Sequence, residues 1–281
     1  MVEVVHRGMY STIQDLGRFG YRNLGVPLSG AMDRISATLA NRILNNSDED
    51  AVMEITLMGP KLRFQEDAII AIVGADLHPK VNDESIEMNM MVSISKGDLL
   101  SFGKASVGTR AYIAVAGGWQ TPLVLGSRSM YNGITEASAM EKGDLLALKE
   151  QSKNIHTTQS SLQLDASHFN TRKISVSEGP EWQQLSTSLQ QKILKGNFSV
   201  SPQSNRMAYR LEGVEDINGS EIITAPVQPG TVQLTPSGDC IVLMRDAQTT
   251  GGYSRILQLS EQAICELAQK RGGANVQFEL T

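Results

Sequence analysis

Four short stretches of the chain combine charged, hydroxyl and amide side chains with glycine, and they lack the apolar periodicity of buried elements. Glycine lets backbone amides approach a ligand closely, and arginine offers a fork of donors to a carboxylate or phosphate. These stretches therefore predict a site that binds and orients a polar, anionic small molecule. They cover residues 12–22, 29–33, 114–129 and 245–253, and residues 204–210 accompany the last of them.

Two aspartates that follow apolar runs are the candidate catalytic residues. Asp76 comes after the run 68–73, and Asp246 comes after the run 241–244. A strand that ends in a polar cluster, as the run before Asp246 does, is costly to bury without a function, so this aspartate is the harder of the two to explain as purely structural. The candidate substrate-binding residues are Arg18, Arg128, Asn205, Arg206, Tyr209, Arg210, Gln248, Thr249, Thr250, Gly251, Gly252 and Tyr253.

Each of these features also has a purely structural interpretation. Met32 and Met207 have the spacing of core-filling residues, and His78 is typical of a surface loop. Asp15 and Arg18 would form a surface ion pair worth less than about 1 kcal/mol. The glycines that would simply serve tight turns are Gly17, Gly20, Gly117, Gly118, Gly251 and Gly252.

Several familiar signatures of catalysis or cofactor binding are missing from the sequence. It contains no phosphate-loop motif, no GxGxxG and no GxSxG. None of its 4 histidines has the spacing of a zinc site. We therefore expect no bound metal on this chain, and the motifs support ligand binding more than a self-contained catalytic machine.

The composition narrows the class of protein. A formal net charge of −5 offers no electrostatic attraction to nucleic acid or to an anionic membrane. No apolar stretch approaches the roughly 20 residues that span a bilayer, and the first residues do not resemble a signal peptide. Cys240 and Cys265 do not form a CxxC pair. We expect a cytoplasmic protein with reduced thiols.

A pattern of proline, serine and methionine occurs twice, at residues 27–32 and again at residues 202–207. A Glu-Ile pair and an apolar run ending in polar residues follow each copy, in the same order. This repetition predicts two related domains. We expect the first at residues 1–155, a polar linker at 156–172, and the second domain at 173–281.

The predicted elements are mostly short strands, which favours barrel-like or sandwich-like domains over an alternating α/β sheet. Three helices are expected, at 30–45 with Ser29 as N-cap, at 181–194, and at 260–271 with Ser260 as N-cap. The expected strands are 2–5, 52–57, 68–73, 98–102, 110–115, 196–200, 221–224, 231–234, 240–244 and 276–280.

The motifs together resemble the family of allophanate hydrolase subunit 2-like, biotin-dependent carboxyltransferase-like proteins, which includes the C subunit of bacterial 5-oxoprolinase. They occur in the family's order along nearly the whole chain. The matching segments are TIQDLGR (12–18), GVPLSGAMD (25–33), YIAVAGG (112–118), LGSRS (125–129), VSPQSNRM (200–207), YRLEG (209–213) and QTTGGY (248–253).

The resemblance implies a mainly β protein of two cyclophilin-like barrel domains related by duplication. It also implies partner proteins, a B subunit and an A subunit, with which the chain hydrolyses 5-oxo-L-proline to L-glutamate at the expense of ATP. On that route Arg128, Arg206 and Arg210 would hold a carboxylate or phosphate, Asp246 or Asp76 would orient a proton transfer, and glycine-flanked amides would cradle an oxyanion.

Two other functions stay open at this point. One is the carboxyltransferase half of a biotin-dependent urea or amide carboxylase, although this chain carries no biotin-carrier motif. The other is a regulatory protein that binds a B-type partner, which resembles an inhibitor of a sporulation kinase.

Overall fold

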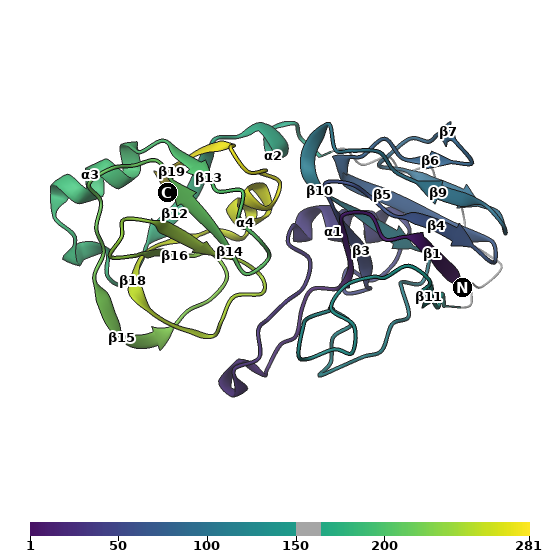
Figure 1. The fold of residues 1–281 in the computed structure, drawn as a ribbon, viewed down its shortest axis with the longest axis horizontal. Coiled ribbons are helices and arrows are strands. Elements are labelled where there is room, and N and C mark those ends of the chain that lie inside the picture. The colour runs from purple at the N-terminus through teal and green to yellow at the C-terminus, as the bar shows by residue number, and fades with distance from the viewer. Residues whose placement is uncertain (150–163) are drawn as a thin grey trace. The chain divides into compact units, whose positions relative to one another are not determined.

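The computed structural model describes residues 1–149 and 164–281, and this part of the chain divides into two compact units (Figure 1). Unit 1 contains Met1–Arg18 and Ser29–Asp165, and unit 2 contains Phe19–Leu28 and Ala166–Thr281. The segment 19–28, here called the strap, therefore packs with unit 2, whereas the sequence placed it in the first domain. The first part of the expected linker, 156–163, lies outside the described residues, and residues 167–170, within its second part, form a short helix.

The described residues of unit 1 form two sheets and one helix. One sheet has the strand order β11-β1-β4-β9-β6-β7, and the other has the order β2-β3-β10-β5-β8. The helix is α1 (Arg34–Ile43). The strands are β1 (Val2–His6), β2 (Tyr10–Gln14), β3 (Val52–Thr56), β4 (Lys61–Phe64), β5 (Ala68–Asp76), β6 (Lys80–Val81), β7 (Glu84–Ser85), β8 (Met91–Ile94), β9 (Leu99–Ser101), β10 (Val107–Val115) and β11 (Leu145–Leu146).

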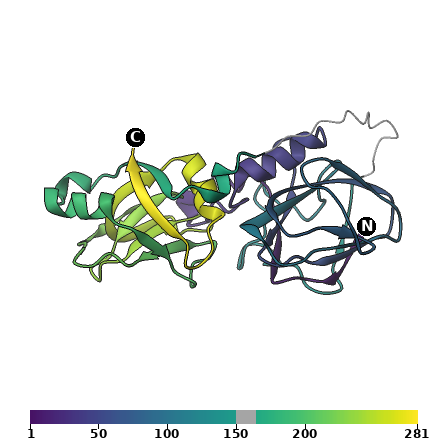
Figure 2. The ribbon, with the colours of Figure 1, turned by 90° about the horizontal axis from the view of Figure 1, so that it is seen from above.

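The five-stranded sheet is buried on both faces, because alternate side chains along its strands enter two different clusters. Ile70 and Ile72 of β5 join the core that also takes residues from the other sheet. Ala71 and Val73 join a second cluster under α1, which lies outside the strands (Figure 2). This packing explains why β5 reads as an uninterrupted apolar run.

The helix α1 begins at Arg34, later than its periodicity suggests. Asp33, not Ser29, is the N-cap, and its carboxylate accepts from the backbone N of Ser36 at 3.1 Å. Ser29 has φ 56°, a left-handed conformation that a residue other than glycine rarely adopts. The prediction of Ser29 as N-cap is therefore wrong, since the chain bends at Ser29 and residues 30–32 separate it from the true cap.

Unit 2 is a closed barrel with one extra strand. Its sheet runs β12-β19-β13-β14-β17-β16-β18-β15, and an additional pairing of β12 with β18 closes the ring. Its elements are η1 (Arg22–Leu24), α2 (Ser167–Asn170), β12 (Lys173–Glu178), η2 (Trp182–Gln184), α3 (Thr187–Lys195), β13 (Phe198–Val200), β14 (Ala208–Glu212), β15 (Glu221–Pro226), β16 (Thr231–Leu234), β17 (Cys240–Leu243), β18 (Thr250–Leu259), α4 (Glu261–Ala268) and β19 (Asn275–Leu280).

The architecture confirms the prediction of a mainly β protein with a few helices. Ser260 caps α4 as expected, accepting from the backbone N of Ala263 at 3.1 Å. The two Pro-x-Ser-x-x-Met copies precede different elements, since residues 27–32 lead to α1 and residues 202–207 lead to β14. Met32 is a buried core residue, whereas Met207 is exposed.

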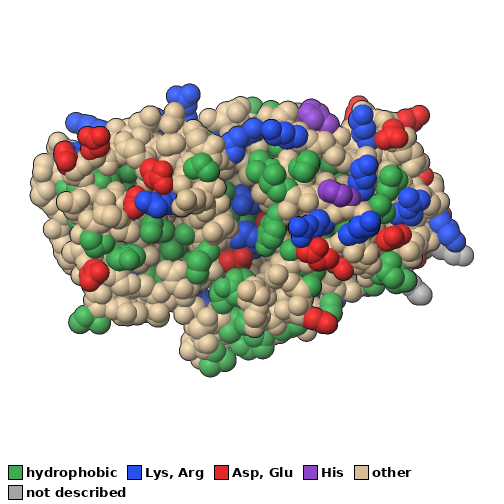
Figure 3. Space-filling view, viewed as in Figure 1, with side chains coloured by type: hydrophobic (Ala, Val, Ile, Leu, Met, Phe, Trp, Pro, Cys, Tyr) green, Lys and Arg blue, Asp and Glu red, His purple; other side chains and the backbone are tan. Residues whose placement is uncertain are grey.

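On the face shown in Figure 3, Lys and Arg side chains are interspersed with Asp and Glu, so the charges of one sign do not cover that face. This agrees with the small net charge of −5. Among the residues that the structure describes, no helix has both the length and the apolar character needed to cross a membrane.

Candidate functional site

The carboxylate of Asp15 joins two of the polar stretches of unit 1. Its Oδ1 accepts from the hydroxyls of Ser127 at 2.7 Å and Ser129 at 2.6 Å, and from the backbone N of Gly17 at 2.8 Å. Its Oδ2 accepts from the backbone N of Arg128 at 2.6 Å. The structure thus brings residues 12–22 and 125–129 together around one acceptor, and these bonds fix the loop.

The two predicted binding arginines of unit 1 take part in holding that loop. Arg18 is fully buried and donates to the carbonyl oxygens of Val124 at 3.1 Å and Ser129 at 2.7 Å. Arg128 donates to the carbonyl oxygen of Thr121 and to the side chain of Gln120. The surface ion pair considered for Arg18 is excluded by its burial. A role of these residues in binding an anion stays a prediction.

The stretch 29–33 has its own internal acceptors for its backbone amides. The backbone N of Met32 donates to Glu54 at 2.7 Å, and the backbone N of Asp33 donates to the hydroxyl of Tyr112 at 2.8 Å. Tyr112 in turn donates to Glu54 at 2.9 Å, and burial raises the pKa of its phenol well above the usual value. These amides therefore hold the protein's own side chains where the sequence suggested an oxyanion.

Asp76 lies at a cavity of unit 1 with a volume of about 410 Å³. Its Oδ1 accepts from the backbone N of His78 at 2.8 Å and lies 3.6 Å from the imidazole Nδ1 of the same residue. Both side chains are about half exposed, so His78 is the surface-loop residue that the sequence suggested. Asp76 is open to solvent and to small molecules, and its catalytic role stays a prediction.

In unit 2, the predicted pair Arg206 and Asp246 come together, but they bind each other. The guanidinium donates through Nε to Oδ2 at 2.8 Å and through Nη2 to Oδ1 at 3.0 Å. The side chains are 7% and 11% exposed. A further bond joins the backbone N of Asp246 to the carbonyl of Arg206. This is a buried, bidentate ion pair that fixes the end of β17 against the start of β14.

The other predicted residues of unit 2 lie in different surroundings. Tyr209 is buried, and its hydroxyl donates to the carbonyl oxygens of Ala268 and Lys270. Asn205 caps a turn by accepting from the backbone N of Met207 at 2.8 Å. Arg210 is exposed and pairs with Asp239 at 3.0 Å.

The glycine-rich end of the predicted site begins a strand. Thr250, Gly251, Gly252 and Tyr253 are the first residues of β18, where Thr250 pairs with Pro226 and Gly251 with Ala225. The carbonyl oxygen of Thr249 accepts from the backbone N of Val227 at 3.1 Å, and Gln248 is half-buried. A side chain at Gly251 would meet the amide of Gln233 at 2.6 Å, which explains the glycine without a ligand.

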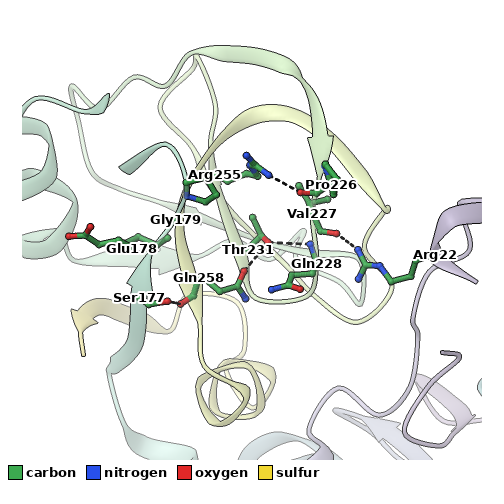
Figure 4. Close-up of a pocket in the computed structure, with 12 residues that line it drawn as sticks. Arg22, Ser177, Glu178, Gly179, Pro226, Val227, Gln228, Thr231, Arg255 and Gln258 are labelled. Atoms are coloured by element: carbon green, nitrogen blue, oxygen red, sulfur yellow. Dashed lines mark hydrogen bonds between the residues drawn. The ribbon is translucent and has the colours of Figure 1, made fainter. Parts of the chain in front are cut away.

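A second cavity, of about 520 Å³, lies in unit 2 and is drawn in Figure 4. This volume falls in the usual range for sites that bind small molecules. None of the predicted site residues is among the described residues that line it. Those residues are Arg22, Ser177, Glu178, Gly179, Pro180, Pro226, Val227, Gln228, Thr231, Arg255, Leu257 and Gln258.

Hydrogen bonds along one side of this cavity hold its wall in place. The hydroxyl of Thr231 donates to the side chain of Gln258 at 3.0 Å and accepts from the backbone N of Gln228 at 3.2 Å. The side chain of Gln258 donates to the carbonyl oxygen of Pro229 at 2.9 Å. Gly230 stands in this turn with φ 87°, and a side chain there would come within 2.4 Å of Gln258.

Arg255 is held in the wall of the cavity by an ion pair and a backbone carbonyl. It donates to Glu181 through Nη2 at 2.7 Å and through Nε at 3.0 Å, and to the carbonyl oxygen of Pro226 at 3.0 Å. The hydrogen bonds from Arg255 hold the pKa of Glu181 below its usual value, and those to Glu181 raise the pKa of Arg255. The pair contributes no net charge to the cavity.

Among the described residues that line the cavity, the other cationic side chain is Arg22. It comes from the strap, is half-buried, and donates to the carbonyl oxygen of Val227. At the end of the cavity away from Arg22, the carboxylate of Glu178 points outward (Figure 4). Among the described lining residues Glu178 is the only carboxylate, and none is a histidine or cysteine. This set of groups suits the binding of a polar ligand; it offers no activated nucleophile.

Sequence reasoning selected Arg22 only as part of a stretch and chose none of the other cavity residues as site residues, although the segment 178–180 departs from the family pattern in a way that bears on anion binding. A signal was present in Gly179, where a side chain would stand 2.3 Å from the carbonyl oxygen of Arg255. Within residues 1–149 and 164–281, no three His, Cys, Asp or Glu side chains gather in a way that could hold a metal ion.

Comparison with known proteins decides the family. A model of the carboxyltransferase domain, subdomain A and B, matches residues 24–280. The chain belongs to this family. It is 32% identical to the 5-oxoprolinase C subunit of Escherichia coli over 99% of this chain and 90% of that protein. It is 31% identical to the 5-oxoprolinase C subunit of Haemophilus influenzae over 99% of this chain and 91% of that protein.

Solved structures of similar fold belong to longer chains. The crystal structure of TTHA0988 superposes with a TM-score of 0.89 at 27% identity, covering 99% of this chain and 55% of that one. The Kluyveromyces lactis urea carboxylase gives a TM-score of 0.86 at 28% identity, covering 99% of this chain and 27% of that one. This chain thus spans about half of the first protein and about a quarter of the second, so the family fold occurs there beside further segments.

Proposed function

We propose that this chain is the C subunit of an ATP-dependent 5-oxoprolinase, which acts with A and B subunits to hydrolyse 5-oxo-L-proline to L-glutamate. The observation that carries the proposal is the identity of 32% with a 5-oxoprolinase C subunit along nearly the full length of both proteins.

The chemistry explains why several subunits and ATP would be needed. An unstrained lactam is a poor electrophile at neutral pH, and transfer of the γ-phosphoryl group of ATP to its carbonyl oxygen would activate the carbon. This transfer releases ADP. One water then adds to the activated carbon, the C–N bond breaks with protonation of the nitrogen, and a second water hydrolyses the resulting acyl phosphate to glutamate and phosphate. Within this complex, we propose that this chain contributes to positioning the ligand.

The proposed complex works in the cytoplasm, and this chain alone is inactive. Supporting this setting, Cys240 and Cys265 are both buried and free, so no disulfide is needed for the fold. The cavity of unit 2 supports the inactivity, because the groups that line it offer no activated nucleophile.

Reconstitution tests the proposal. The chain would be mixed with candidate A and B subunits, and glutamate release from 5-oxoproline would be followed with and without ATP. Omitting this chain should abolish release, and adding it back should restore it. Release of glutamate at full rate from the A and B subunits without this chain would contradict the proposal.

A second function is favoured by one specific observation. A segment of 153 residues, 53% of this chain, is 44% identical to the urea amidolyase of Lachancea kluyveri, although it covers only 8% of that protein. The alternative is therefore a carboxyltransferase component that accepts CO₂ from carboxybiotin carried by another chain. Inhibition of the reconstituted reaction by avidin, together with dependence on bicarbonate, would favour this alternative.

A further inference from the structure

The strap introduces one arginine into a cavity that is otherwise built from residues 177–258. Residues 19–28 leave unit 1 after Arg18 and return to it at Ser29, yet they pack with unit 2. Within this segment the short helix η1 begins at Arg22, and Gly25 ends it in a left-handed conformation with φ 79°. The local fold thus presents Arg22 to the cavity of about 520 Å³.

Arg22 keeps most of its hydrogen-bonding capacity. A guanidinium carries several N–H donors arranged as a fork, and Arg22 uses one of them on the carbonyl oxygen of Val227. That bond orients the group without neutralising it, because a carbonyl carries no net charge. The nearby Arg255 differs, since Glu181 binds its guanidinium through both oxygens. The charge of Arg22 is therefore available to an anion.

Gln228 also lines this cavity, and it directly follows Val227, whose carbonyl oxygen accepts from Arg22 (Figure 4). Its backbone N is held by Thr231, but its side-chain amide makes no hydrogen bond with the residues that the structure describes. A primary amide supplies both a donor and an acceptor. It matches the C=O and N–H of a cyclic amide, as the guanidinium matches a carboxylate.

We infer that Arg22 and Gln228 form the subsite that holds the carboxylate and the amide of a small carboxylated lactam. This inference rests on the proposed function, which supplies 5-oxoproline as the compound to test. Arg22 would set the affinity for the carboxylate, and Gln228 would orient the ring. The subsite then explains why the strap packs with unit 2, although the residues before and after it in the sequence belong to unit 1.

Direct binding to the full chain, alone and assembled with A and B subunits, is the first test. Calorimetry or ligand-observed NMR would use 5-oxoproline and 2-pyrrolidinone, a lactam that lacks the carboxylate. Arg22→Gln should weaken 5-oxoproline binding by about 10- to 100-fold, the usual effect of losing a charged hydrogen-bonded contact. The same variant should leave 2-pyrrolidinone binding unchanged, whereas a purely structural role of Arg22 would affect both compounds alike.

Two further variants complete the test. Gln228→Ala removes an exposed side chain without hydrogen bonds and should weaken the binding of both lactams by about 2- to 10-fold. Arg172→Gln is the matched control, because Arg172 is an exposed arginine of the same unit outside the cavity. This variant should bind 5-oxoproline as tightly as the wild type.

The turnover assay separates this inference from the proposed function. In an active complex, Arg22→Gln should raise the KM for 5-oxoproline with a much smaller change in kcat. A wild-type complex that releases no glutamate would refute the proposed function, while the binding measurements would still decide the subsite. The inference is overturned if Arg22→Gln binds 5-oxoproline as tightly as the wild type, or if the wild type binds it in neither state.

Discussion

Replacing Asp246 by Asn tests whether the pair formed with Arg206 is chiefly a structural element. The substitution preserves the size of the side chain and removes its charge. It leaves a guanidinium that is 7% exposed without the carboxylate that neutralises it. Desolvating a charge costs several kcal/mol, and in the wild type two hydrogen bonds of 2.8 Å and 3.0 Å offset that cost.

The expected loss follows from this burial. Breaking one partner of a buried ion pair costs about 3–5 kcal/mol, whereas an exposed pair contributes at most about 1 kcal/mol. Asp246→Asn should therefore lower the free energy of unfolding of unit 2 by about 3 kcal/mol or more. The double variant Arg206→Met with Asp246→Leu, which removes both charges, should recover most of that loss.

Urea unfolding can report on unit 2 alone, because the chain has only 2 tryptophans and they lie in different units. Trp119 belongs to unit 1 and Trp182 to unit 2, and both are buried. In a Trp119→Phe background, fluorescence follows Trp182. Glu279→Gln provides the control, because its ion pair with Lys173 is exposed and its loss should cost less than about 1 kcal/mol.

The reasoning is refuted if Asp246→Asn costs no more than the Glu279→Gln control. A variant that keeps full stability yet loses turnover in the assembled complex would instead support the catalytic role predicted for Asp246.

Three further predictions concern unit 2. The pKa of Glu181 is lowered by Arg255, so its stabilising effect is present above the unfolded value of about 4.3 and is lost as the pH falls through the folded value. The difference in unfolding free energy between wild type and Glu181→Gln should narrow in acid, and a constant difference would contradict this. Ser260→Ala removes the N-cap of α4 and should cost about 1 kcal/mol in urea unfolding; no change would show that another group caps the helix. Burial raises the pKa of the Cys240 thiol to about 12, so peptide mass spectrometry should find it alkylated at roughly pH 8, below the usual thiol pKa, only after unfolding.

Strands with β-branched, apolar runs were predictable, and polar strands were not. The run at residues 68–73 and the final strand correspond to β5 and β19. By contrast, Thr250–Leu259 forms the longest described strand of unit 2, although two glycines stand near its start. Its polar start resembles a binding loop in the sequence, because the pairing with Pro226 that makes it a strand is invisible there.

The candidate site was only partly predictable for a related reason. The motifs around Asp15 and Ser127 were recognised one by one, and only the fold shows that they share a hydrogen bond. The sequence also could not reveal that Arg206 is satisfied by Asp246, since the two are 40 positions apart. Several arginines that the sequence suggested as exposed donors to a ligand are buried, and they donate to groups of the protein instead.

The cavity of unit 2 escaped prediction because its residues come from separate segments. Ser177, Val227 and Arg255 lie on different strands or loops, and Arg22 arrives from the first tenth of the chain. None of these segments carries a motif by itself. The site exists only as a result of the barrel closure that joins β12 to β18.

The excursion of residues 19–28 also governs how this protein can be cut and assembled. Three peptide junctions, after residues 18, 28 and 165, connect the two units, so no single cleavage separates them into complete bodies. A fragment ending near residue 165 would contain residues 19–28 but lack the part of unit 2 with which these ten residues pack. During translation, residues 19–28 are synthesised well before the strands of unit 2 with which they pack. Recombinant halves of the protein should therefore require co-expression to recover a native barrel.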